Sequence, residues 1–114
     1  MKRLWGRRAG VVLSLALATL SASRADAADA DGKALFRVKC GVCHLQGGGG
    51  TWMLGRRLGA EQALLESRKE LPAALVRYVA RNGINSMPRF TRVELPDAEL
   101  DAIALYLSTP RGTP

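Results

Sequence analysis

Both cysteines and the single histidine of this chain lie within five consecutive positions, Cys40-Gly41-Val42-Cys43-His44. Two thiols at this spacing can each add to a vinyl group on neighbouring edges of one porphyrin and form thioethers. The histidine that follows is then held beside the iron, where an imidazole nitrogen can bind as the proximal ligand. The C-x-x-C-H pattern therefore predicts one haem c per chain, attached covalently through Cys40 and Cys43, with His44 as an iron ligand.

Three other chemistries use similar residues and explain the motif less completely. A structural zinc site needs about four ligands, which usually come from two such cysteine pairs. A thioredoxin-like dithiol is expected in a βαβ pattern, whereas the pattern of this chain is helical. A disulfide between Cys40 and Cys43 suits an exported protein but leaves His44 without a role. Haem attachment is the interpretation that uses all three side chains.

A second iron ligand from this chain has to be a residue other than histidine. Met53 and Met87 are the candidates, because Met1 belongs to the leader described below. Met53 stands in an apolar run, where a flexible thioether commonly fills a gap. Met87 stands between two predicted helices, and Pro88 restricts it to an extended backbone. We expect Met87 to bind the iron; the alternatives are Met53 and an open coordination position.

The elements that must position these residues have helical periodicity. Helices are predicted from about Asp31 to Val42, from Pro72 to Asn82-Gly83 and from about Pro96 to Leu107. Proline is favoured in a first helical turn and glycine just after a last one. The apolar positions that follow the helical spacing are Leu35, Val38, Val42, Leu75, Val76, Val79, Leu100, Ile103, Ala104 and Leu107. The chain has no convincing alternating strand pattern, so the predicted fold class is all-α.

Two segments between the predicted helices are less regular. The run Gly47-Gly48-Gly49-Gly50 is unfavourable for a helix or a strand, and a flexible linker is its simplest explanation. Ordered apolar sequence resumes directly afterwards at Thr51, so we expect a compact loop packed against the cofactor. A further short helix is predicted at about Ala60 to Arg68.

The first 27 residues have the pattern of a secretory signal peptide. The basic start MKRLWGRRAG precedes an apolar run from Val11 to Leu20, and Ala25-Asp26-Ala27 supplies an A-x-A cleavage site. The apolar run is shorter than the roughly 20 residues that a membrane-spanning helix needs. We expect cleavage after Ala27, a mature domain of residues 28–114 in the periplasm and no membrane span after cleavage. An uncleaved anchor is the alternative.

Removal of this leader changes the charge of the chain. Five basic residues and one acidic residue leave with it, so the net charge falls from +7 to +3. The high isoelectric point therefore describes the precursor and does not indicate nucleic-acid binding. A mature domain of fewer than about 90 residues usually needs a disulfide, a metal or a cofactor to stabilise its interior. A covalently bound haem would meet this need.

From about Gly32 to Leu107 the chain resembles small class I bacterial cytochromes c. The matching residues are Gly32, Phe36, Cys40, Cys43, His44, Asn82, Gly83, Met87, Pro88, Phe90, Tyr106 and Leu107. The resemblance implies a cytochrome c-like fold with three main helices around one haem, in which Gly32 and Phe36 pack near Tyr106. Many of these proteins carry Gly-Pro after the haem motif, and its backbone helps to orient the proximal imidazole. Here no proline lies between His44 and Pro72, so the acceptor for the second nitrogen of His44 is unassigned.

Histidine and methionine together would fill the iron's coordination positions, which leaves one-electron exchange as the expected chemistry. The sequence offers no catalytic acid–base pair or nucleophile, so we expect an electron carrier or electron-transfer subunit rather than an enzyme. The chain also resembles cytochrome subunits of periplasmic flavocytochrome dehydrogenases. That likeness implies a flavoprotein dehydrogenase as donor and a respiratory protein as acceptor. If Met87 does not bind the iron, a five-coordinate haem sensor or a peroxidase-like protein is the alternative; a structural haem module is a third hypothesis.

Four arginines are expected around the exposed haem edge. They are Arg56, Arg57, Arg89 and Arg92. We predict that they form a basic rim that steers the encounter with an acidic redox partner. Ordinary solvated surface charge is the alternative.

Overall fold

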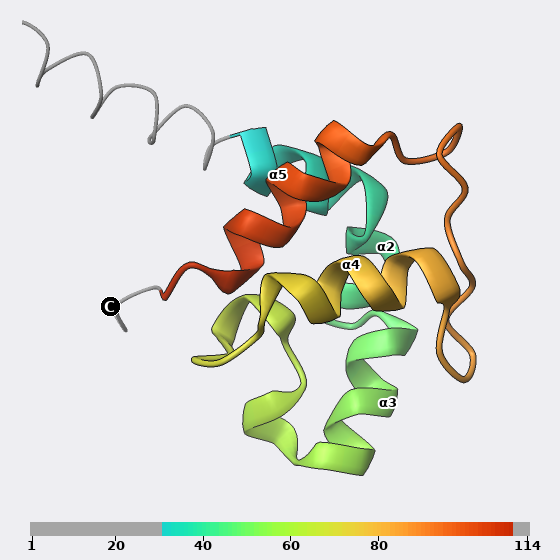
Figure 1. Cartoon of the computed structure of the whole chain (residues 1–114). Coiled ribbons are helices and arrows are strands. Elements are labelled where there is room, and N and C mark those ends of the chain that lie inside the picture. The colour runs from blue at the N-terminus through green and yellow to red at the C-terminus, as the bar shows by residue number, and fades with distance from the viewer. Residues whose placement is uncertain (1–30, 111–114) are drawn as a thin grey trace, which may run out of the picture.

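The computed structural model describes residues 31–110, and the expected signal peptide at residues 1–27 lies outside them. Residues 31–39 form the first helix. The later elements are α2 (Gly41–His44), α3 (Gly49–Leu58), η1 (Ala60–Gln62), η2 (Leu65–Ser67), α4 (Ala73–Asn82) and α5 (Asp97–Ser108) (Figure 1). Within residues 31–110 no strand forms, and the β pairing consists of an isolated bridge between Ile84 and Met87. The predicted all-α class is therefore confirmed.

The three predicted main helices are present, with changes at their ends. The first was expected to continue to Val42, but its helical backbone stops at residue 39 and a turn at Cys40 separates it from α2. Pro72 and Pro96 stand at the N-cap positions of α4 and α5, so each helix begins one residue after its predicted start. Gly83 ends α4 as predicted, with a positive φ of 72° that glycine adopts without a steric penalty.

The prediction that Gly47–Gly50 is wholly a loop is wrong, because α3 begins at Gly49. Glycine has a low helix propensity, but close packing decides here. A Cβ at Gly48 would overlap the carbonyl oxygen of Cys43 and lie 2.6 Å from its carbonyl carbon. The absence of side chains thus allows the start of α3 to approach the C-x-x-C-H backbone.

The predicted short helix at about Ala60 to Arg68 forms as two separate 3₁₀ turns, η1 and η2. Leu64 adopts an extended backbone, with φ −86° and ψ 121°, and interrupts the helix between them. The following residue, Leu65, faces the cavity described below. The irregular connection therefore delivers an apolar side chain to the interior.

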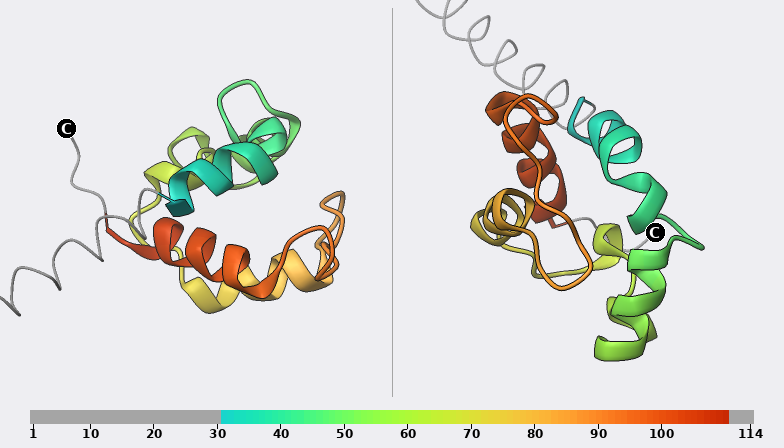
Figure 2. Two further views of the ribbon diagram at one scale, coloured as in Figure 1. Left: turned by 90° about the horizontal axis from the view of Figure 1, so that it is seen from above. Right: turned by 90° about the vertical axis from the view of Figure 1, so that its right-hand side faces the viewer.

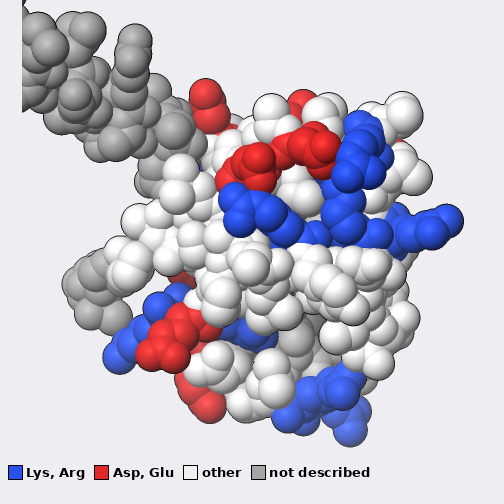
Figure 3. Space-filling view, viewed as in Figure 1, with Lys and Arg blue, Asp and Glu red and all other residues white. Residues whose placement is uncertain are grey.

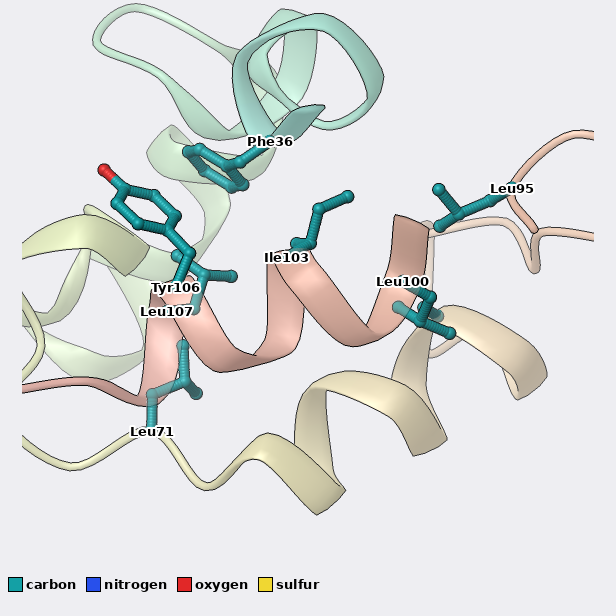
Figure 4. Close-up of a cluster of buried hydrophobic side chains, with 8 residues drawn as sticks. Phe36, Leu71, Leu95, Leu100, Ile103, Tyr106 and Leu107 are labelled. Atoms are coloured by element: carbon teal, nitrogen blue, oxygen red, sulfur yellow. The ribbon is translucent and has the colours of Figure 1, made fainter. Parts of the chain in front are cut away.

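The first helix and α5 cross closely, as the resemblance implied (Figure 2). A Cβ at Gly32 would overlap the carbonyl oxygen of Ala102 and lie 2.7 Å from the Cβ of Tyr106. One turn further along, the rings of Phe36 and Tyr106 lie with their centroids 6.1 Å apart and tilted by 45° (Figure 4). The predicted packing of Gly32 and Phe36 near Tyr106 is confirmed.

The core lies around α5, which also packs on α4 (Figures 1 and 4). Its buried apolar residues are Phe36, Leu71, Ala80, Leu95, Leu100, Ile103, Tyr106 and Leu107. Full burial of a large apolar side chain contributes about 1.5–3 kcal/mol to the stability of the folded state. No helix within residues 31–110 is both long enough and apolar enough to cross a bilayer.

Candidate functional site

A cavity of about 530 Å³ lies between the helices and has mostly apolar walls. It brings Cys40, Cys43 and His44 together with Met87, although Met87 belongs to the distant segment between α4 and α5. Its size falls in the range of about 300–1,000 Å³ that is typical of ligand and cofactor sites. All four residues predicted to hold the haem therefore face one space.

The two cysteines reach this cavity from the turn before α2 and from α2 itself. Neither forms a disulfide, and Cys40 is partly buried whereas Cys43 is exposed. Burial, and after it the neighbouring Cys43, raises the pKa of the Cys40 thiol to about 11. Among residues 31–110, no three His, Cys, Asp or Glu side chains gather as a metal site. The zinc alternative therefore lacks its ligand set there.

The imidazole of His44 is held by close contacts with the backbone. A Cβ at Gly50, in the first turn of α3, would lie 3.1 Å from Cε1 and 3.3 Å from Nδ1 of His44. Burial lowers the pKa of His44, and the charge of Arg68 lowers it further. The ring is therefore neutral near neutral pH and keeps a nitrogen lone pair for a metal.

The buried Nδ1 of His44 has no hydrogen-bond partner in the described part of the chain. This agrees with the proline-free sequence after the motif, which left the acceptor unassigned. The nearby backbone is fixed instead by Thr51, a residue that sequence reasoning overlooked. Its buried hydroxyl donates to the carbonyl oxygen of Leu45 at 2.9 Å and contacts that of Cys43 at 3.4 Å. Thr51 thus ties the start of α3 to the end of the C-x-x-C-H segment.

Met87 is presented by a tight turn. The amide of Met87 donates to the carbonyl of Ile84 at 2.9 Å, and the amide of Ile84 donates back at 3.1 Å. Asn85, inside the turn, has a positive φ of 51°. The backbone of Met87 packs on Gly83, where a Cβ would lie 2.8 Å from its carbonyl oxygen. The turn and this close approach fix the residue at the cavity wall.

Met53 also lines the cavity. It lies on α3 one helical turn after Gly50, the residue that contacts the His44 ring. Met53 therefore belongs to the wall beside the imidazole, whereas Met87 comes from a separate segment. Two ligands on opposite faces of a porphyrin must approach from different walls, so this arrangement favours Met87 as the partner of His44.

Two arginines also line the cavity: Arg57, which the sequence placed at the haem edge, and Arg68, which sequence reasoning overlooked. Arg68 donates through Nε to the carbonyl of Gln62 at 2.9 Å, and its buried Nη2 has no hydrogen-bond partner among the described residues. Burial lowers the pKa of Arg68. A partly buried cation of this kind is stabilised by an anion. The two carboxylates of a haem fit this need, as the thiols, imidazole and thioether fit its vinyl groups and iron.

The predicted basic rim is only partly realised. Arg56 and Arg57 lie on α3 rather than on a loop, and Arg56 stacks over Trp52 at 5.0 Å from the ring centroid. Arg92 donates to a carboxylate oxygen of Asp97 at 2.9 Å, so its charge is paired. Figure 3 shows basic side chains at the lower edge of the viewed face, where α3 lies, and mixed charges near the start of α5. Among the described residues, the rim arginines without an ion pair are Arg56 and Arg57 on α3 and the exposed Arg89 between α4 and α5.

Comparison with known proteins agrees with this geometry. Residues 27–107 match the family described as "Cytochrome C oxidase, cbb3-type, subunit III". The match covers most of the chain, including the helices and the cavity, and the chain belongs to this family of cytochrome c domains. Its members carry covalently bound haem c, and the protein is an electron-transfer protein rather than a catalytic enzyme.

The chain is also similar to the cytochrome c subunit of 4-cresol dehydrogenase [hydroxylating] from Pseudomonas putida. The two are 32% identical over 102 residues, which cover 88% of this chain and 79% of that subunit. No solved structure gives a significant match. The predicted resemblance to cytochrome subunits of dehydrogenases is confirmed.

Proposed function

We propose that this protein carries electrons in the periplasm from a dehydrogenase to a respiratory acceptor. The observation that carries the proposal is the single cavity that joins the two thiols and the imidazole of the C-x-x-C-H segment to Met87. When bound, haem c supplies one-electron exchange between ferric and ferrous iron. The remaining chemistry belongs to the side chains of this protein.

Each group at the cavity has a separate task. Cys40 and Cys43 would hold the porphyrin through thioethers, and His44 and Met87 would be the ligands of its iron. With both ligands in place, the iron would have no open position for a substrate. The apolar walls exclude water, and the guanidinium of Arg68 would bind a propionate. The protein would thus bind, orient and insulate one redox group.

The proposed donor is a flavoprotein dehydrogenase. Support comes from the similarity to a subunit named for 4-cresol dehydrogenase, with most of both chains covered. Arg56 and Arg57 on α3, together with the exposed Arg89, supply positive charge for an acidic partner surface. The basic, apolar and A-x-A pattern of residues 1–27 supports export to the periplasm.

Purification and rapid mixing test the proposal. The protein, purified from its own cells, is expected to be associated with a flavoprotein in fixed stoichiometry. Ferric holoprotein mixed with that flavoprotein in its substrate-reduced form should become reduced, at a rate that falls as ionic strength rises. A protein that purifies without a flavoprotein, and is not reduced by a reduced flavoprotein dehydrogenase, would contradict the donor proposal.

A further inference from the structure

The segment between α4 and α5 carries Met87 and is largely exposed, from residue 84 to residue 94. Segments with few buried contacts open more readily than the core. Upstream of the thioether, the hydrogen-bond pair between Ile84 and Met87 closes the turn. Downstream, one backbone hydrogen bond connects the segment to α4, from the amide of Phe90 to the carbonyl of Ala80 at 2.7 Å. Something further has to hold the exposed part of the segment.

Thr91 and Glu94 bond each other within the segment, whereas the side chain of Arg81, in the last turn of α4, makes most of the remaining hydrogen bonds from another helix. Its Nη1 donates to the carbonyl of Phe90 at 3.2 Å and contacts that of Thr91 at 3.4 Å. Its Nη2 donates to the carbonyl of Leu95 at 2.8 Å and to Oδ1 of Asp97 at 2.7 Å. The side chain is only 18% exposed. One planar guanidinium therefore joins both ends of the segment from residue 90 to residue 97.

We propose that Arg81 is a positioning residue that keeps the Met87 segment closed and so holds the thioether at the iron. The inference rests on the proposed role of Met87 as a ligand. Phe90, which Arg81 binds, lies three residues after Met87, and Pro88 stiffens the backbone between them. Restraint at Phe90 is therefore transmitted to Met87. Without the contacts of Arg81, the segment would be held near the thioether only by the turn with Ile84 and by the bond from the amide of Phe90 to the carbonyl of Ala80.

Two neighbouring cations, Arg77 and Lys39, do not make the contacts that Arg81 makes near Met87. Arg77 lies one turn earlier on α4 and binds Asp101 of α5 at 2.5 Å, and within residues 31–110 it makes no hydrogen bond to the Met87 segment. Lys39 donates to the carbonyl of Glu94 at 3.1 Å, which lies further along the chain from Met87. Both contacts tie elements together, but neither reaches the residues next to the thioether. Arg77 therefore provides a matched control for Arg81.

The test uses ferric holoprotein and imidazole, which competes with a thioether for the iron. Arg81→Gln should bind imidazole about tenfold more tightly than wild type, because a charge-assisted contact that closes the segment is lost. Its weak far-red absorption, the mark of a thioether–iron bond, should decrease, while far-ultraviolet circular dichroism shows unchanged helix content. Arg77→Gln should match wild type in all three measurements. Wild-type imidazole affinity and far-red absorption in Arg81→Gln would overturn the inference.

Met87→Ala separates this inference from the ligand assignment. If wild type and Met87→Ala share the same far-red absorption and imidazole affinity, the assignment of Met87 fails, and the inference fails with it. If Met87→Ala loses the band but Arg81→Gln behaves as wild type, only the role of Arg81 fails. Should Arg81→Gln yield no holoprotein, Arg81→Lys decides. Lysine keeps the charge but lacks the planar fork, so a severalfold rise in imidazole affinity is expected, and an unchanged affinity overturns the inference.

Discussion

Gly50 lies directly against His44: a Cβ at residue 50 would be 3.1 Å from Cε1 of the imidazole and 2.9 Å from the carbonyl oxygen of Cys43. The glycine-rich start of α3 therefore packs against the ring and the backbone that carries it. In a sequence without proline after the haem motif, this packing can restrict the imidazole without a hydrogen bond to Nδ1.

Alanine substitutions at Gly48, Gly49 and Gly50 should change the free energy of unfolding in opposite directions at adjacent positions. Gly48→Ala and Gly50→Ala force the Cys43 carbonyl or the imidazole to move, and overpacking of this kind costs about 1–3 kcal/mol. At Gly49 a Cβ would meet nothing within 4 Å. Gly49→Ala should therefore be neutral or stabilise the helix by up to about 1 kcal/mol. Urea unfolding of the three holoproteins measures the difference, and equal effects at all three positions would contradict the packing.

Thr51 should be needed for its hydroxyl rather than for its shape. Thr51→Val removes the hydroxyl donor to the carbonyl of Leu45, which then keeps only the amide of Gly48 at 3.0 Å, and should lower the free energy of unfolding by about 0.5–1.5 kcal/mol. Thr51→Ser keeps the hydroxyl and should cost less. Chemical denaturation of both holoproteins tests this, and a valine variant as stable as the serine variant would show that the bond contributes nothing.

Arg68 should affect the redox properties of the protein. Loss of its positive charge beside the cavity makes the oxidised state easier to form, so Arg68→Gln should lower the midpoint potential by on the order of tens of millivolts. Arg56 lies outside the cavity, over Trp52, and Arg56→Gln is the matched control with little change expected. Potentiometric titration measures both, and equal shifts in the two variants would remove the special role of Arg68.

Stability should depend on the ionisation of Asp97 in acid. Hydrogen bonds from Arg81, and then from Arg92, hold the pKa of its carboxyl below the ordinary value of 3.8. Because the pKa is lower in the folded state, the stabilisation is complete above pH 3.8 and is lost as the pH falls through the folded value. The difference in unfolding free energy between wild type and Asp97→Asn should therefore be constant near neutral pH and shrink in strong acid. A difference that stays constant throughout the acid range would contradict this.

The residues that carry distinctive chemistry could be predicted from the sequence. The spacing of Cys40, Cys43 and His44 and the setting of Met87 before a proline indicated the site, and the structure brings all four to one cavity. The helices α4 and α5 followed from apolar periodicity, because apolar side chains at the helical spacing face the cavity or the core. These features are local in sequence or depend on residue type. The predicted apolar face of the first helix is wrong, because Val38 and Val42 are 79% and 84% exposed, and the side that packs on α5 carries Gly32 and Phe36 instead.

The predictions that were wrong, and the functional residues that sequence reasoning overlooked, depend on tertiary contacts. Helix propensity alone argued against Gly49 and Gly50 in a helix, whereas the close approach of Gly48 and Gly50 to the haem motif favours glycine at these two positions. Arg68 and Arg81 resemble ordinary surface cations in the sequence. Their roles appear only when the fold places one guanidinium in an apolar cavity and the other over the carbonyls of the segment after Met87.

The central claim is that one haem is attached at the C-x-x-C-H segment and bound on its other face by Met87. Mass spectrometry combined with ferric absorption spectra of the holoprotein tests it most directly, with Met53→Ala and Met87→Ala measured beside wild type. We expect the mass of the mature polypeptide plus one haem in all three, and far-red thioether absorption in wild type and Met53→Ala but not in Met87→Ala. A mass equal to the bare polypeptide, or a far-red band that persists in Met87→Ala, would contradict the claim.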